Sequence, residues 1–94
     1  MASEDKRFAH CVLLFRSIHD VTAAEYVLKT AGIWCDMVPT PRSLSTNCGM
    51  VLEFHGRDLD LVKEAMTTTT ARPRCVGIYT CSGTAYEREP WDPS

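Results

Sequence analysis

The sequence lacks the features that mark several large classes of protein. Basic residues do not outnumber acidic ones, 10 against 12, and the formal net charge is -2. Dedicated nucleic-acid-binding domains usually carry a basic excess, so this balance argues against one. No apolar run approaches the roughly 20 residues that cross a bilayer, and no apolar leader follows the charged N-terminus. We therefore expect a cytoplasmic protein that binds neither nucleic acid nor a membrane.

Paired cysteine motifs are also absent. None of the five cysteines forms a Cys-x-x-Cys pair, the spacing of thioredoxin-type sites and zinc knuckles. Their odd number and the missing export signal predict reduced thiols and no structural disulfide. We expect no metal site and no bound cofactor. The cysteines are Cys11, Cys35, Cys48, Cys75 and Cys81, and all but Cys48 are expected mainly in or near the core.

The length of 94 residues allows one domain with one modest core. We expect this domain to span residues 8–81. Residues 1–7 are charged, and residues 82–94 contain glycine, two prolines and mixed charges. Both segments are predicted to be flexible termini.

Strand-length apolar runs alternate with stretches of helical periodicity along the chain. The helices are expected over residues 20–31 and from Asp58 to about residue 67. The strands are expected at residues 10–16, 33–38, 48–55 and 74–80. This β-α-β-β-α-β order predicts an α+β, ferredoxin-like sandwich, with an antiparallel sheet of order 4-1-3-2 and both helices on one face.

The first helix carries the clearest boundary signals. Val21, Ala24 and Leu28 recur at helical spacing and form one apolar stripe. Asp20 is the predicted N-cap, with Thr22 and Glu25 as an alternative capping box, and Gly32 is the predicted residue that ends the helix.

This topology gathers several polar residues at one end of the sheet. The first helix starts there, the long connection 39–47 lies there, and the third strand begins there with Cys48. The residues predicted to share this rim are Ser17, His19, Asp20, Arg42, Cys48, Arg72 and Arg74.

Two stretches carry a family resemblance: residues 15–20 (FRSIHD), followed by Ala24 and Glu25, and the loop of residues 39–49 (PTPRSLSTNCG). Through them the chain resembles the putative selenium/sulfur carrier protein-like family, over roughly residues 8–80. Members carry a proline-arginine, serine-rich, Cys-Gly loop after the second strand. The resemblance implies a thiol that carries sulfur or selenium, as a persulfide or perselenide, between a donor and an acceptor protein.

Cys48 is the leading candidate for that thiol. A carrier needs an accessible thiolate, and a cysteine with the ordinary pKa of about 8.5 needs a nearby cation or helix N-terminus to form one at neutral pH. Arg42 and the start of the first helix would supply both. Gly49 would let a partner approach closely, and Ser45 would satisfy backbone groups in a turn. The alternative is that Cys48 is a small buried side chain at a strand start.

Ser17, His19 and Arg74 are candidates for binding on the same rim. Histidine is the side chain that ordinarily exchanges a proton near neutral pH, so His19 is a candidate proton shuttle, although a capping or surface histidine is the commoner case. Arg74 would extend a basic rim, or it simply leads into the last strand. Cys81 is the candidate resolving thiol for Cys48.

Two functions of different kinds follow. The first is a sulfur or selenium carrier or adaptor, more a carrier than an enzyme, that acts through Cys48 between partner proteins. The second is a non-enzymatic regulatory or protein-interaction module in which Cys48 is structural. An RNA-binding sheet ranks third, because Phe15 and Phe54 lie at strand ends and basic residues are few. A homodimer remains open.

Overall fold

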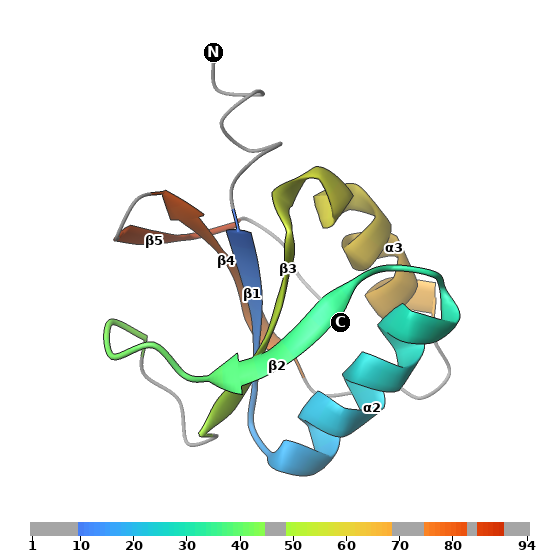
Figure 1. The fold of residues 1–94 in the computed structure, drawn as a ribbon, viewed down its shortest axis with the longest axis horizontal. Coiled ribbons are helices and arrows are strands. Elements are labelled where there is room, and N and C mark those ends of the chain that lie inside the picture. Colours follow the sequence, from blue (N-terminus) through green and yellow to red (C-terminus); the bar gives the residue numbers. More distant parts are fainter. Residues whose placement is uncertain (1–9, 45–48, 69–74, 83–84, 90–94) are drawn as a thin grey trace.

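The computed structural model describes residues 10–44, 49–68, 75–82 and 85–89. Five strands form one antiparallel sheet, and two helices pack on the same side of it (Figure 1). The elements in chain order are β1 (His10–Phe15), α2 (Ile18–Thr30), β2 (Cys35–Pro39), β3 (Met50–His55), the 3-10 turn η1 (Gly56–Asp58), α3 (Leu59–Thr68), β4 (Cys75–Ser82) and β5 (Ala85–Arg88). Neither described helix is long and apolar enough to cross a membrane.

The α+β class is confirmed, whereas the predicted sheet of four strands in the order 4-1-3-2 is wrong, because a fifth strand extends the sheet beyond β4. The sheet order is β2-β3-β1-β4-β5, because β5 pairs with β4 and becomes an edge strand. The sequence around β5 shows no apolar periodicity, and we expected only loose chain there. The hydrogen-bonding groups along the outer edge of β4 need partners, and β5 satisfies them. The fold is therefore not a simple ferredoxin-like sandwich.

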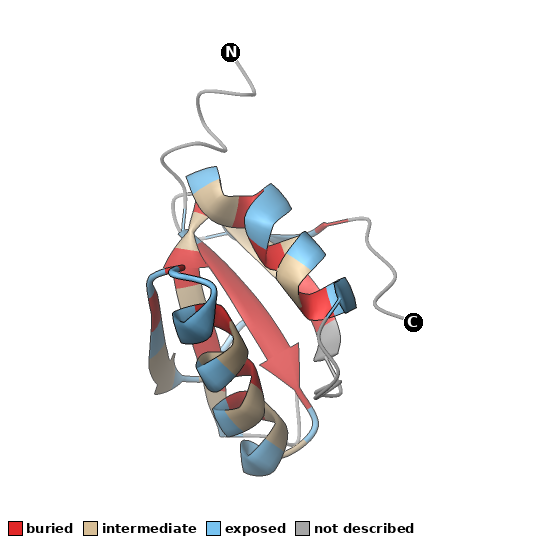
Figure 2. Ribbon diagram, turned by 90° about the vertical axis from the view of Figure 1, so that its right-hand side faces the viewer, coloured by how far each residue is buried: buried red, intermediate tan, exposed pale blue. Residues whose placement is uncertain are grey.

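β1 is buried on both faces, which explains its unbroken apolar run. Cys11, Leu13 and Phe15 face the helices and are completely buried. Val12 and Leu14 face the other way and are 1% exposed, packed in a second, smaller cluster. Figure 2 shows the buried strands beneath the inward stripes of the two helices.

Helix α2 begins at Ile18, two residues before the predicted start at residue 20. Its N-cap is Ser17, not Asp20: the Ser17 hydroxyl accepts a hydrogen bond from the Asp20 amide at 3.3 Å and donates one to the Asp20 carboxylate at 3.1 Å. Asp20 stands at N3, the position of the acidic residue in a capping box, but its carboxylate accepts from the Ser17 hydroxyl. The predicted stop at Gly32 is confirmed. Gly32 has a φ of +77°, and its amide and that of Ile33 satisfy carbonyls in the last turn of α2.

Helix α3 follows the 3-10 turn that contains Asp58. Leu59, Val62 and Met66 are its buried residues, at i, i+3 and i+7, the spacing of one helical face. The helix continues through Thr67 and Thr68, although β-branched residues are poor helix formers. The Thr67 and Thr68 hydroxyls donate to the carbonyls of Lys63 and Glu64, at 2.7 and 3.0 Å, and are thereby satisfied within the helix.

Candidate functional site

The connection between β2 and β3 is closed at its base by main-chain hydrogen bonding. Pro39 pairs with Met50 as the last pair of the two strands, and the Thr40 amide donates to the Gly49 carbonyl at 3.0 Å. Gly49 is exposed, and a Cβ added to it would meet nothing within 4 Å. Ser45 and Cys48 lie outside the described residues. Cys48 is nevertheless covalently joined to Gly49, whose position at the exposed base is described.

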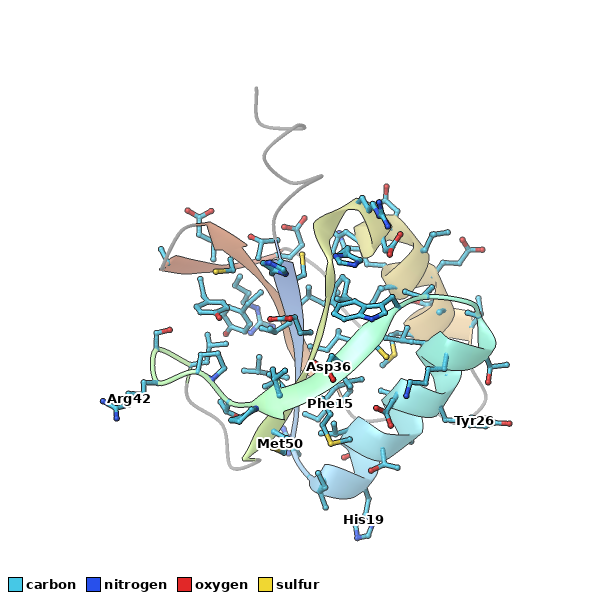
Figure 3. All side chains as sticks on the ribbon, viewed as in Figure 1. Phe15, His19, Tyr26, Asp36, Arg42 and Met50 are labelled. Carbon is cyan, nitrogen blue, oxygen red and sulfur yellow. The ribbon has the colours of Figure 1, made fainter. Side chains whose placement is uncertain are left out.

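The first half of the connection turns toward the sheet face opposite to the helices. The Leu44 amide donates to the Pro41 carbonyl at 3.0 Å, which forms a turn. Leu44 packs against the second apolar cluster, which contains Val12, Leu14 and Val51. Arg42 is exposed and points outward on the side away from the helices (Figure 3).

The start of α2 lies at the same end of the sheet as Gly49. The pairing of Leu13 with Leu52 brings the last residue of β1 and the first residue of β3 to one end. His19 is exposed there and points outward, in a different direction from Arg42 (Figure 3). Ser17 is engaged as the N-cap. Cys48, Arg72 and Arg74 lie outside the described residues, so the gathering of all these residues on one rim stays a prediction.

The side chains of three other cysteines are described, and two of them are in the core. Cys11 is completely buried, and Cys35 is 6% exposed. Burial raises the pKa of the Cys35 thiol, and the nearby Glu25 carboxylate raises that pKa further. A thiol that is both inaccessible and reluctant to ionise is a poor nucleophile.

Cys81 is half-buried on the sheet face opposite to the helices. Its cross-strand partners are His10 on β1 and Tyr86 on β5. Burial and the electrostatic effect of Cys81, which also hydrogen-bonds to the Tyr86 side chain, raise the pKa of Tyr86. The pairing with His10 places Cys81 at the end of the sheet opposite to Gly49, about 17 Å away along β1.

His10, Trp34 and His55 form an aromatic cluster that no sequence pattern predicted. The Trp34 and His55 rings stack with centroids 4.5 Å apart and planes 21° apart, and the His10 ring centroid lies 6.5 Å from that of His55. These residues are far apart in sequence, and only the strand register aligns them. Within the described ranges, no three His, Cys, Asp or Glu side chains are arranged to hold a metal ion.

Comparison with known proteins gives one match. The family model described as "Putative Se/S carrier protein-like" matches residues 10–76, from the start of β1 into β4. No curated protein and no solved structure matches the chain. β5 lies beyond the matched region.

Proposed function

Because the chain belongs to the "Putative Se/S carrier protein-like" family, we propose that it carries a sulfur or selenium atom on the Cys48 thiol between a donor and an acceptor protein. It acts in the cytoplasm and needs no bound cofactor, since the two partner proteins supply and remove the atom. The atom carried is either sulfur or selenium, because the two elements undergo the same exchange.

The transfer is a thiol exchange in two steps. In loading, the Cys48 thiolate attacks the protonated outer sulfur of a donor persulfide. A new S–S bond forms, the donor S–S bond breaks, and the donor leaves as a thiolate. The donor is thereby reduced as Cys48 becomes a persulfide. In unloading, a nucleophile of the acceptor attacks the outer sulfur, and the Cys48 thiolate leaves with the electron pair of the S–S bond.

The observation that best supports this proposal is the closed, exposed base of the connection at Gly49. The Thr40–Gly49 hydrogen bond anchors the residue next to Cys48, while the exposed glycine leaves room for a partner. The described core thiols are unsuited to the task, because Cys11 and Cys35 are buried and the pKa of Cys35 is raised. A carrier thiol must instead be reached by two proteins in turn.

We propose Arg42 as the cation that favours the Cys48 thiolate. Its side chain is exposed and forms no ion pair with a described residue. The N-terminus of α2 would add about 0.3–1 kcal/mol in favour of the thiolate, which is too little alone. Ser45 would satisfy the backbone of the connection, and Ser17, His19 and Arg74 would contact the donor or acceptor.

The test is sulfur loading of the reduced protein. Inorganic polysulfide is the donor, and the product is identified by intact mass and by the mass of the alkylated peptides. We expect one added sulfur atom on Cys48 in the wild type and in the matched control Cys81→Ser, and none in Cys48→Ser. Arg42→Ala should load more slowly, while Arg57→Ala, which removes an exposed arginine from η1, should load at the wild-type rate.

Two results would count against the proposal. If Cys81 takes up the sulfur in preference to Cys48, the carrier thiol is misassigned. If no cysteine is loaded, the carrier function fails and the interaction module with a structural Cys48 becomes the better account. Loading of Cys48 at equal rates in Arg42→Ala and wild type would remove only the role given to Arg42.

A further inference from the structure

The sheet face opposite to the helices is divided into two unlike parts. One part is the apolar cluster of Val12, Leu14 and Val51, which Leu44 helps to cover. The other part lies toward the free edge of the sheet, on and beside β2 and β3. It consists of Trp34, Asp36, Glu53 and His55, and we call it the acidic–aromatic edge.

Two carboxylates face each other across the strands of this edge. Asp36 on β2 is the direct cross-strand partner of Glu53 on β3. Like charges directly opposite each other destabilise a sheet unless a cation lies nearby. The partner of Glu53 on its other side is Val12, which is apolar. Among the described residues, no lysine or arginine forms an ion pair with Asp36 or Glu53.

Arg88 is a described cation on the far side of this face. It lies on β5 as the cross-strand partner of Tyr79, and its guanidinium lies over Gly77 of β4, where a Cβ would meet Arg88 Cζ at 3.2 Å. β4 is two strands away from β3 in the sheet order, which corresponds to about 10 Å. At that distance Arg88 forms no ion pair with Glu53.

A partly exposed aromatic surface borders the two carboxylates. Trp34 directly precedes β2, stacks on His55 and is 48% exposed. The stack orders the indole ring, so a ligand that packs against the exposed part of the ring does not have to immobilise it. β2 is the last strand on this side of the sheet, so a partner can approach from beyond it. Figure 3 shows Asp36 on this outermost strand.

We propose that the acidic–aromatic edge binds an arginine side chain of the protein that exchanges sulfur or selenium with this chain. A guanidinium is planar, stacks on an indole, and donates paired hydrogen bonds to a carboxylate. It therefore matches both parts of the surface and relieves the repulsion between Asp36 and Glu53. The identity of the partner rests on the proposed function, while the recognition of arginine does not.

The location of this surface suits a carrier. From Asp36, β2 continues to Pro39 at the base of the connection that bears Cys48, a distance of about 10 Å along the strand. A partner anchored at Asp36 by an arginine thus has its own surface beside the Cys48 connection. This anchor would favour close approach of the donor or acceptor to the thiol.

Peptide binding measured by calorimetry at low salt tests the proposal. The probes are a short arginine-containing peptide, the same peptide with lysine, and the same peptide with the neutral isostere citrulline. We expect the arginine peptide to bind most tightly and the citrulline peptide about tenfold more weakly or worse. Trp34→Ala and the isosteric double variant Asp36→Asn/Glu53→Gln should each weaken the arginine peptide by a similar factor.

A matched double variant separates this surface from net charge. Asp60→Asn/Glu64→Gln removes two exposed carboxylates from α3, on the other side of the molecule, and should bind as the wild type does. Equal weakening in the two double variants, or no binding by the wild type, would overturn the proposal. Asp36→Asn/Glu53→Gln should unfold at no lower urea concentration than the wild type, which guards against loss of binding through misfolding.

Two further variants test whether a partner protein or this chain itself occupies the acidic–aromatic edge, and separate the arginine site from the carrier function. Tighter peptide binding by Lys6→Ser/Arg7→Ser would show that basic residues of the chain itself compete for the edge, and would contradict a partner as the occupant. Cys48→Ser should bind the arginine peptide normally while failing to load sulfur. If neither Cys48→Ser nor the wild type takes up sulfur but both bind the arginine peptide, the carrier function fails and the arginine site stands.

Discussion

The Cys35 thiol shows how its surroundings determine the chemistry of a single residue. It lies in β2, 6% exposed, on the side of the helices. Burial and the Glu25 carboxylate both favour the neutral thiol, so the pKa of Cys35 is raised in the folded protein. Five cysteines in one short chain thus do not amount to five equivalent nucleophiles, and at least the described core thiols have a packing role.

This raised pKa predicts how stability depends on pH. Below the ordinary pKa of a cysteine thiol, Cys35 keeps its proton in both the folded and the unfolded chain. Above pH 9 the unfolded chain loses that proton first, so the stabilising contribution is lost as pH rises toward the raised pKa. We expect the free energy of unfolding, measured in urea over a pH series, to fall more steeply above pH 9 in the wild type than in Cys35→Ala.

The control for that experiment is Tyr86→Phe, because the raised pKa of Tyr86 adds a similar decline above its ordinary value of 10.0. The free energy of unfolding of Tyr86→Phe should follow that of the wild type between pH 9 and 10 and diverge from it only above pH 10. Parallel curves for Cys35→Ala and wild type throughout would show that the thiol titrates alike in both states.

At the scale of an element, helix α2 is defined by the contacts at its two ends. Ser17 caps the first turn, Asp20 completes the cap, and the turn at Gly32 ends the helix. The helix packs Val21, Ala24 and Leu28 into the main core. Ser17 was a candidate binding residue, and the structure gives it a structural part at the helix start.

The cap predicts the effect of removing one hydroxyl group. Ser17→Ala should lower the free energy of unfolding by about 1 kcal/mol, because the Asp20 amide loses its acceptor. Ser43→Ala, at an exposed serine of the β2–β3 connection, should change it by less than about 0.5 kcal/mol. Urea denaturation measures both. Sulfur loading that drops in Ser17→Ala without a change in stability would show that Ser17 acts in binding and not as a cap.

At the scale of the whole molecule, the chain beyond the family match joins the two layers. β5 completes the sheet at the edge of β4, and the Glu89 amide then donates to the Ile78 carbonyl at 2.9 Å. The Glu89 carboxylate, 8% exposed, pairs with Lys63 of α3 at 3.5 Å. One residue after the last strand therefore ties the edge of the sheet to the helical layer.

Breaking the Lys63–Glu89 ion pair should cost more free energy of unfolding than breaking the Lys29–Glu25 pair, although both join a lysine to a glutamate. Glu89→Gln should lower the free energy of unfolding by about 1–3 kcal/mol, because it leaves a half-buried Lys63 ammonium without its carboxylate partner. Glu25→Gln breaks the exposed pair with Lys29 on α2 and should cost less than about 0.5 kcal/mol. Urea denaturation measures both costs, and the cycle of Glu89→Gln, Lys63→Met and Lys63→Met/Glu89→Gln measures the coupling between Lys63 and Glu89. Equal costs for the two single variants would mean that Glu89 does not join the layers.

The sequence predicted the connection that bears Cys48 but not the surface on β2 and β3. The family motif led to Cys48, Arg42 and Gly49, and the structure describes Gly49 at the exposed base of a closed connection. Nothing in the sequence indicated that Trp34 stacks on His55 or that Asp36 faces Glu53. These pairs come from β2 and β3, and a shift of one residue in register would move every one of them to another neighbour.

The sequence by itself determined the elements that carry a strong internal signal. The unbroken apolar run of β1, the stripe of α2 and the glycine after it are properties of neighbouring residues, and the structure contains each of them. Only the tertiary structure decided that Ala85–Arg88 is a strand and that Glu89 is buried. The physical reason is that a short, charged segment has no core-facing pattern of its own, and its conformation is stable only where β4 offers hydrogen bonds and α3 offers Lys63.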